Sequence, residues 1–447
     1  MPKAAFAHAS QQGFVLLLPT GFYTAAGVLA VALTVFVLIA VPARWMAKAF
    51  APVTVPFPRF RFLHITASCA MAVLFWLLIW AGLAGPRDPL ANPLPLMIWT
   101  VFWVGFLPLQ ALIGNLWAFL NPWSVPLILA RRWIAPRARL HLTRHTGYMI
   151  GVASFIAFAL LLLAHPSPSD PAFLARLAAF YWLATFVFAL VFGPRWLRRA
   201  EGLTLALRLY ARLGFLLRRG GHLQFGLPGW QLANGKSWPL IPAILAVILL
   251  GTGSFDGLNE TFWWLGQLGI NPFEFPGRSA IVWPSINGML LANAALLAVF
   301  AVTLWLGLGM AKAPFGPLTG YRLFAPSILP IALGYHIAHY LPSFLVDSQY
   351  ALVALSDPLL NGSDLLNLGD FYVTTGFFNS QAPVRLIFLS QVSAVVVGHM
   401  LAVVLAHRIA QIHLPTPRQV ILSQLPLSIF MVAYTFFGLW LLASPRF

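Results

Sequence analysis

The sequence predicts an all-α membrane protein, a polytopic bundle of about ten transmembrane helices, and three observations lead to this fold class. Hydrophobic residues make up 60% of the 447 residues, whereas charged residues make up only 8%. Many apolar runs reach the length of about 20 residues that a helix needs to cross a bilayer. Arg and Lys gather in the connections between those runs. The lipid bilayer is therefore the first predicted partner of the chain.

Apolar runs of spanning length mark each predicted helix in turn. The predicted spans are 20–42, 62–84, 95–113, 147–164, 173–194, 238–256, 283–310, 323–345, 386–411 and 419–443. Two further stretches, 114–126 and 259–275, are too short and too rich in Pro, Gly and Trp to span. We expect them to be interfacial or re-entrant segments.

The distribution of charge predicts the orientation. Three connections are rich in Arg and Lys and alternate with connections that are poor in them; the basic ones are 43–61, 121–146 and 195–236. The positive-inside rule places these in the cytoplasm, so both termini are expected outside. The acidic residues then fall on the outer side, with Glu201 as the exception. This arrangement predicts a multi-pass protein of the bacterial inner membrane with an acidic periplasmic face.

Two other classes of protein are excluded by composition. The formal net charge of +17 suggests nucleic acid, but no segment could form the folded basic face that such binding requires, so no nucleic-acid partner is expected. Cys69 is the single cysteine, which excludes an intrachain disulfide, a cysteine zinc site and an iron–sulfur cluster.

The basic connection divides the chain into two predicted halves. Residues 1–195 would form a five-helix N-terminal half, and residues 237–447 a five-helix half with most of the polar residues at membrane depth. Between them lies a basic amphipathic cytoplasmic connector, 196–236. Leucines and arginines alternate at helical spacing over 196–219, which predicts one helix lying on the inner membrane surface.

Three histidines of the second half are predicted to share one depth near mid-bilayer. His336 and His339 are three residues apart on the eighth span, and His399 lies near the middle of the ninth. Ionisable residues at such depth are costly and mark functional sites. Imidazole ligands suit a divalent metal, zinc or copper, so these three residues are the predicted metal ligands.

Carboxylates at the outer face complete the predicted site. Asp256 and Glu260 end the sixth span and would be neighbours on one helical face, where they could act as general base or orient a ligand. Asp347, predicted to cap the outer end of the eighth helix, and Asp370 are possible additional ligands. His407 is a further candidate, although its position about 12 Å beyond His399 keeps it from the same ion. Tyr335 and Tyr340 flank the histidine pair and could donate hydrogen bonds.

A haem is the alternative cofactor. His336 and His339 are too close in sequence to ligate two separate haems. A single haem b between His399 and either of them stays open. Small residues beside His399, among them Ala394 and Gly398, indicate close helix packing instead of chemistry.

Four short motifs resemble a family of polytopic bacterial membrane proteins described as fenitrothion hydrolase-like. They are "GNLWAFLNPW", "SFDGLNET", "YHIAHYL" and "VVGHMLAVVLAHR". The resemblance implies hydrolysis of an organophosphate triester inside the membrane, with a second membrane subunit as a possible partner. It implies functional roles for His336, His339, His399 and His407 together with Asp256. Arg408 follows the last of these histidines where the family tends to have an acid, which puts the role of His407 in doubt.

Two classes of function fit these residues. The first is a metal-dependent membrane enzyme that hydrolyses an apolar ester or uses copper for oxidation, with a site open to the periplasm. The second is a transporter or permease for a metal cation or protons, in which the same groups bind a cation in transit. A haem-bearing subunit of a membrane complex is a third possibility.

Overall fold

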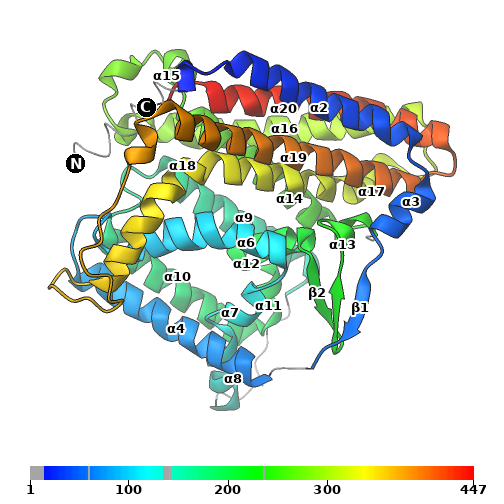
Figure 1. Ribbon diagram of the computed structural model, residues 1–447. Helices are drawn as coiled ribbons and strands as arrows, with labels where there is room; N and C mark the ends of the chain where they lie inside the picture. The colour runs from blue at the N-terminus through cyan, green and yellow to red at the C-terminus, as the bar shows by residue number, and fades with distance from the viewer. Residues whose placement is uncertain (1–14, 59–60, 134–139, 141, 235–236, 447) are drawn as a thin grey trace. The chain divides into compact units, whose positions relative to one another are not determined.

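The computed structural model describes residues 15–58, 61–133, 140, 142–234 and 237–446. Within these residues, ten helices are long and apolar enough to cross a membrane (Figure 1). The predicted all-α fold class is therefore confirmed, and the chain has the helices of a multi-pass membrane protein.

Most spanning segments are single helices, and the third, seventh and eighth are composed of consecutive pieces. In order, they are α2 (Thr20–Ala40), α4 (Arg61–Ala84), α5 (Pro93–Pro95) with the π-helix η1 (Leu96–Phe106) and α6 (Leu107–Ile113), α9 (Arg144–Ala164), α10 (Pro171–Phe192), α14 (Leu240–Asn259), η4 (Arg278–Ile281) with α16 (Val282–Met310), α17 (Pro317–Phe324) with η5 (Ala325–Ile328) and α18 (Leu329–Ser356), α19 (Gln381–His413) and α20 (Pro417–Ala443).

Short elements occupy the connections. They are α3 (Ala43–Ala49), α7 (Trp117–Leu120), α8 (Ser124–Trp133), α11 (Arg195–Arg199), α12 (Gly202–Tyr210), η2 (Ala211–Leu213), α13 (Trp230–Ala233), α15 (Phe262–Gln267), η3 (Pro272–Glu274) and η6 (Gly376–Phe378). A small sheet has the strand order β1 (Val53–Pro56), β3 (His222–Phe225) and β2 (Leu216–Arg219). The antiparallel pair β2 and β3 aligns Leu216 with Phe225.

The single amphipathic helix predicted over 196–219 is wrong. The buried Glu201 ends α11 and caps α12, because its carboxylate accepts the backbone N–H groups of Leu203 and Thr204. Most of α12 is buried within the protein, so it presents no continuous apolar face to a membrane surface. The chain then enters the β2–β3 hairpin, which turns at two glycines with φ of 58° and 87°, Gly220 and Gly221.

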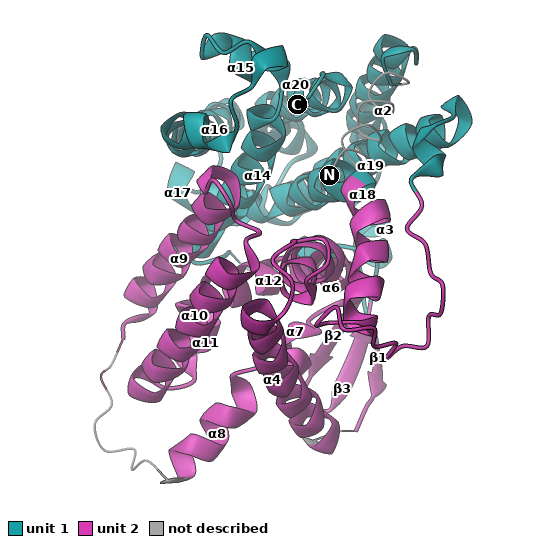
Figure 2. Cartoon of the chain, turned by 90° about the vertical axis from the view of Figure 1, so that its left-hand side faces the viewer, with its two compact units in different colours: residues 1–53, 226–342, 375–447 teal, residues 54–225, 343–374 magenta. Residues whose placement is uncertain are grey.

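The chain forms two compact units (Figure 2). Unit 1 combines 1–53, 226–342 and 375–447, and unit 2 combines 54–225 and 343–374. This grouping by contact differs from the predicted division at 196–236 because the first span, α2, packs on α19 and α20 of the C-terminal half. The predicted halves as such stay a prediction.

In unit 1, α18 and α19 cross with their backbones in contact. A Cβ atom added to Gly334 would lie 2.3 Å from the carbonyl oxygen of Ala394, and one added to Gly398 would lie 2.5 Å from that of Pro330. Such small residues let membrane helices approach each other closely. The prediction that Ala394 and Gly398 mark close helix packing is confirmed.

In unit 2, the motif "GNLWAFLNPW" ties the α6–α8 segment to α12. The indole Nε1 of Trp117 donates to Thr204 Oγ1 at 2.8 Å, and the side-chain amide of Gln110 donates to the carbonyl of Leu207 at 2.8 Å. Ser68 of α4 donates to the carbonyl of Asn121 at 2.7 Å. The buried polar residues of this motif therefore have a structural role within unit 2.

Large apolar side chains cover the outward faces of the spanning helices. Exposed examples are Phe36, Trp80, Phe180, Leu291, Trp305 and Ile429. In water such exposed apolar surface would favour aggregation, whereas lipid tails accept it. Contact with a lipid bilayer is the environment that these faces require.

The α18–α19 crossing generates a stability prediction. We expect Gly398→Leu to lower the free energy of unfolding by about 1–3 kcal/mol or more, because the new side chain overlaps backbone that cannot move aside. The measurement is thermal unfolding of the detergent-purified protein. Gly309→Leu is the matched control, since a Cβ atom at Gly309 meets no atom within 4 Å. Equal melting temperatures for the two variants would contradict the prediction.

Candidate functional site

Two carboxylates at the end of α14 begin the candidate site. Asp256 lies in the last turn of α14 and is 9% exposed, and Glu260 follows the helix at its C-cap in the αR conformation. Residues four apart are neighbours on a helix, so both carboxylates lie on one face, as predicted. The side chain of Glu260 is 43% exposed, whereas that of Asp256 is 12% exposed. The site therefore has a buried acid and a more accessible one.

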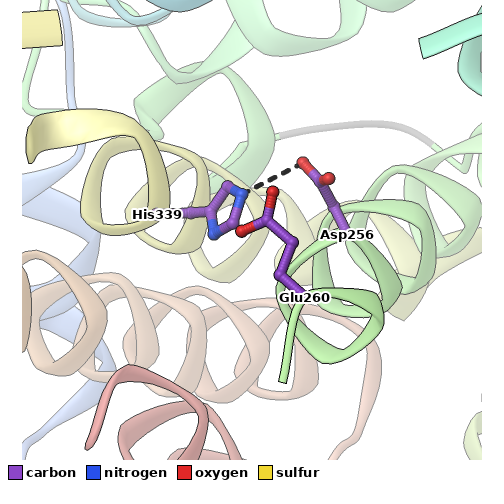
Figure 3. Close-up of side chains that lie close together, drawn as sticks. All are labelled: Asp256, Glu260 and His339. Carbon is purple, nitrogen blue, oxygen red and sulfur yellow. Dashed lines mark ion pairs between the residues drawn. The ribbon is translucent and has the colours of Figure 1, made fainter. Parts of the chain in front are cut away.

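His339 of α18 lies against both carboxylates (Figure 3). Its Nε2 atom is 3.3 Å from Oδ2 of Asp256, and its side chain is 4% exposed. The hydroxyl of Tyr340 donates a hydrogen bond to the same Oδ2 atom, so the predicted donor role of this tyrosine is confirmed. A buried carboxylate needs such donors, because burial without them costs several kcal/mol per charge.

Arg446, near the end of the chain, supplies the positive charge of the cluster. Its Nη1 atom lies 3.1 Å from Nδ1 of His339 and 3.9 Å from Oε2 of Glu260. A backbone bridge between Thr261 and Arg446 holds this segment beside the end of α14. A guanidinium has only donors, so Nδ1 of His339 accepts and the ring proton is on Nε2, facing Asp256.

Gly257 brings α14 and α18 together at the site. A Cβ atom at Gly257 would lie 1.8 Å from the hydroxyl of Tyr335 and 3.6 Å from Nδ1 of His339. The rings of Tyr335 and His339 stack with 6.0 Å between their centroids and 9° between their planes. The missing side chain at Gly257 thus makes room for the tyrosine that packs on the histidine.

Asp256, Glu260 and His339 form a group that could hold a metal ion. One ligand atom from each side chain lies within 4.8 Å of the ligand atoms of the other two. Among the described residues, this is the group of three His, Cys, Asp or Glu side chains whose ligand atoms come so close together. Metal bonds of about 2.0–2.2 Å place the ligand atoms of one ion at most about 4.4 Å apart. A small inward movement of the three side chains would therefore let them bind one ion. With a neutral His339, two carboxylates balance one divalent cation.

His336 and His399, the other two predicted ligands, are not members of this group. His336 is buried, with its ring 4.9 Å from that of Tyr340. His399 is 1% exposed, and its Nδ1 atom lies 2.9 Å from the carbonyl oxygen of Val395. The predicted set of three histidine ligands therefore stays a prediction, whereas the carboxylates join His339 directly.

The three additional candidates lie elsewhere. His407 of α19 has its Nε2 atom 3.0 Å from the side-chain nitrogen of Gln411. Asp347 and Asp370 belong to unit 2, where Asp370 is exposed in the loop after α18. The prediction that Asp347 caps the histidine helix is wrong, because α18 continues through Pro342 to Ser356. A proline inside a membrane helix is tolerated where neighbouring groups accommodate it.

Arg446 and Gly257 are the site residues that sequence reasoning did not identify. Arg446 is distant in sequence from the other members and reaches them only through the tertiary fold. Gly257 had a detectable signal, since a glycine inside a helix indicates close approach of another group. The pair "DG" in "SFDGLNET" combines the candidate ligand Asp256 with Gly257, which leaves space for the ring of Tyr335.

The described fold and site together define a class: an all-α, multi-pass membrane protein with a buried carboxylate–imidazole cluster that could hold a metal ion. No protein-family model, no curated protein and no solved structure matches the chain.

The contact between Gly257 and Tyr335 is testable by a pair of substitutions. We expect Gly257→Ala to displace the Tyr335 hydroxyl and to lower the melting temperature, by an overpacking cost of about 1–3 kcal/mol. Adding Tyr335→Phe removes the overlapping oxygen, so the double variant should recover part of the loss. Thermal unfolding of both variants and of Tyr335→Phe alone checks this. Strictly additive effects would show that the two residues do not act on each other.

Proposed function

We propose that Asp256, Glu260 and His339 bind one divalent metal ion and that the site hydrolyses an apolar ester. The observation that supports this most directly is the convergence of the three donor atoms within 4.8 Å. Zinc is the proposed ion, because it accepts both imidazole nitrogen and carboxylate oxygen ligands. Copper is its competitor for the same ligands.

Arg446 supports the assignment of a cation site. Its Nη1 atom lies 3.1 Å from Nδ1 of His339 and 3.9 Å from Oε2 of Glu260. The carboxylate therefore already stabilises a positive charge at this position. With Arg446 in place and His339 neutral, the cluster carries a net charge of about −1. A divalent cation that displaces the guanidinium neutralises both carboxylates, so the two cations compete for one position.

The side chains of the cluster have distinct roles in the proposed reaction. Glu260 is the more exposed carboxylate, and its oxygen that is not bound to the ion would take the proton of an attacking water. Before the ion binds, Asp256 accepts from Nε2 of His339 and so orients the ring beside the carboxylates. The displaced Arg446 guanidinium can pair with the oxygen that becomes negative during attack. A bound zinc ion would supply a water of lowered pKa and polarise the ester oxygen.

The substrate class is a proposal from the membrane setting and the resemblance. Exposed apolar helix faces indicate that lipid surrounds the chain, so an apolar ester can reach it through the bilayer. The motifs "SFDGLNET" and "YHIAHYL", which resemble the fenitrothion hydrolase-like family, contain all three proposed ligands. An organophosphate triester is the substrate that this resemblance favours.

Metal binding is testable with the purified protein. We expect wild type to bind zinc and His339→Ala and Asp256→Asn to bind it more than about tenfold more weakly, because each removes a ligand. Arg446→Gln should bind zinc more tightly than wild type, since the competing cation is gone. The measurements are elemental analysis and calorimetric titration in detergent.

His407→Ala is the matched control for these titrations. It removes a buried imidazole outside the cluster and should leave zinc binding unchanged. Zinc binding that is equal in wild type, His339→Ala and Asp256→Asn would overturn the proposed site.

Cation transport is the second candidate, and a line of buried polar groups in unit 1 favours it. On α14, Thr252 accepts a hydrogen bond from the side-chain amide of Asn293 at 3.2 Å. Ser254 of the same helix accepts from the hydroxyl of Tyr434 at 2.7 Å. His399 has its ring 6.4 Å from that of Tyr434, and within the described chain its Nε2 atom has no hydrogen-bond partner. Such groups could pass a cation onward from the cluster.

One pair of measurements separates the two functions. We expect detergent-purified wild type to hydrolyse a chromogenic phosphotriester, with a loss of about 10²-fold or more in Glu260→Gln if Glu260 is the base. Proteoliposomes of the same protein should show no zinc uptake above that of empty liposomes. Uptake without hydrolysis, abolished by His399→Ala, would replace the enzyme by the transporter.

A further inference from the structure

A group of arginines gathers in unit 2 where two spanning helices end. α9 begins at Arg144, and α10 ends at Phe192 and is followed directly by α11. α9 and α10 both contact α11. The first turn of α9 and the last turn of α10 therefore lie at the same end of this helix pair, and α11 and α12 cover that end.

Five arginines from four elements form this group, which we call the arginine cluster. They are Arg144 of α9, Arg198 and Arg199 of α11, Arg208 of α12 and Arg212 of η2. Arg208 donates through Nη1 to the carbonyl oxygen of Arg198. A Cβ atom added to Gly147 of α9 would lie 3.3 Å from Cβ of Arg199, so α9 meets α11 at the cluster.

The charges of the cluster are not balanced by the nearest acid. Glu201 is buried, and its carboxylate accepts from the Tyr181 hydroxyl and from the backbone N–H groups of Leu203 and Thr204. Burial lowers the pKa of Arg208, and Arg212, Arg198 and Arg199 lower it further by repulsion. Asp170 is the N-cap of α10 and therefore lies at the opposite end of that helix from the cluster. Its carboxylate pairs with Arg87 at 3.0 Å.

Aromatic side chains lie beside the cluster. Trp196 of α11 packs on Phe192 and Phe188 of α10, with ring centroids 5.2 Å and 4.8 Å apart. Tyr148 of α9 lies under the guanidinium of Arg144, 5.7 Å from it. Tryptophan and tyrosine collect at membrane–water interfaces, where lipid phosphates also lie. The arginines thus follow the ends of two candidate spans, where helices that cross a membrane would meet its phosphates.

We propose that the arginine cluster is a binding site for the phosphate of an anionic lipid headgroup. Guanidinium groups bind phosphate oxygens through paired N–H donors, and several arginines from different helices can surround one phosphate. A phosphomonoester headgroup offers the most negative charge and is the preferred ligand. The acyl chains of the same lipid lie along the exposed apolar faces of α9 and α10, where Met149 and Phe180 are examples.

Titration of the full-length protein in detergent with phosphatidic acid, followed by native mass spectrometry, tests the proposal. Wild type should bind phosphatidic acid at least about tenfold more tightly than phosphatidylcholine of the same chain length. Arg198→Gln/Arg212→Gln should weaken phosphatidic acid binding by about tenfold or more, because it removes two of the cluster's charges. Both side chains are exposed, so the fold should persist, and a helical circular dichroism spectrum checks it.

Arg44→Gln/Arg418→Gln is the matched control, since it removes two exposed arginines of unit 1 and should leave the affinity within about twofold of wild type. A second pair, Arg144→Gln/Arg212→Gln, repeats the test from α9 and should weaken binding similarly. Equal affinities in the cluster pairs and the control pair would overturn the site. Displacement of the lipid by inorganic phosphate at equal concentration would overturn the lipid assignment and identify a site for free phosphate.

Discussion

Polar groups between the ends of the spanning helices have to find their partners inside the protein, because lipid tails offer none. The Asp256–His339 contact meets this condition in unit 1, with Tyr340 as a further donor to Asp256. In unit 2, outside the spanning segments, the buried Glu201 likewise finds its partners inside the protein by capping α12 and accepting from Tyr181. In unit 1 this condition brings the carboxylate of Asp256 to the imidazole of His339. The contacts that satisfy the buried carboxylate therefore also form the group that could hold a metal ion.

Glycines determine how closely the helices that carry these groups can approach. Gly334 and Gly398 allow backbone contact between α18 and α19, and Gly257 accepts the hydroxyl of Tyr335 where α14 meets α18. Helices in lipid gain little from burying apolar side chains against each other, so close van der Waals contact and polar bonds have to hold them. The glycines therefore help to determine the positions of His339 and Asp256, because they allow the helices that carry these residues to approach closely.

Each unit contains one group of charged side chains, and the two groups differ in how their charge is balanced. In unit 1 the cluster combines Asp256 and Glu260 with Arg446, which acts as an internal cation. In unit 2 the acid that follows α11, Glu201, is engaged with Tyr181 and the start of α12, and no ion pair between it and the arginine cluster is found among the described residues. The first arrangement suits a site that exchanges one cation for another, and the second suits an external anion at the membrane surface.

The sequence by itself determined the all-α class, the ten spans and the placement of Asp256 and Glu260 on one helical face, because hydropathy and helical periodicity are local properties of the chain. It did not determine the break between α11 and α12, where Glu201 caps a new helix, or the continuation of α18 beyond residue 345 to Ser356. Only the tertiary structure decided that Arg446, Asp256 and Glu260 lie beside His339. Depth in the membrane can be read from sequence, but the rotation of each helix about its axis depends on packing against its neighbours.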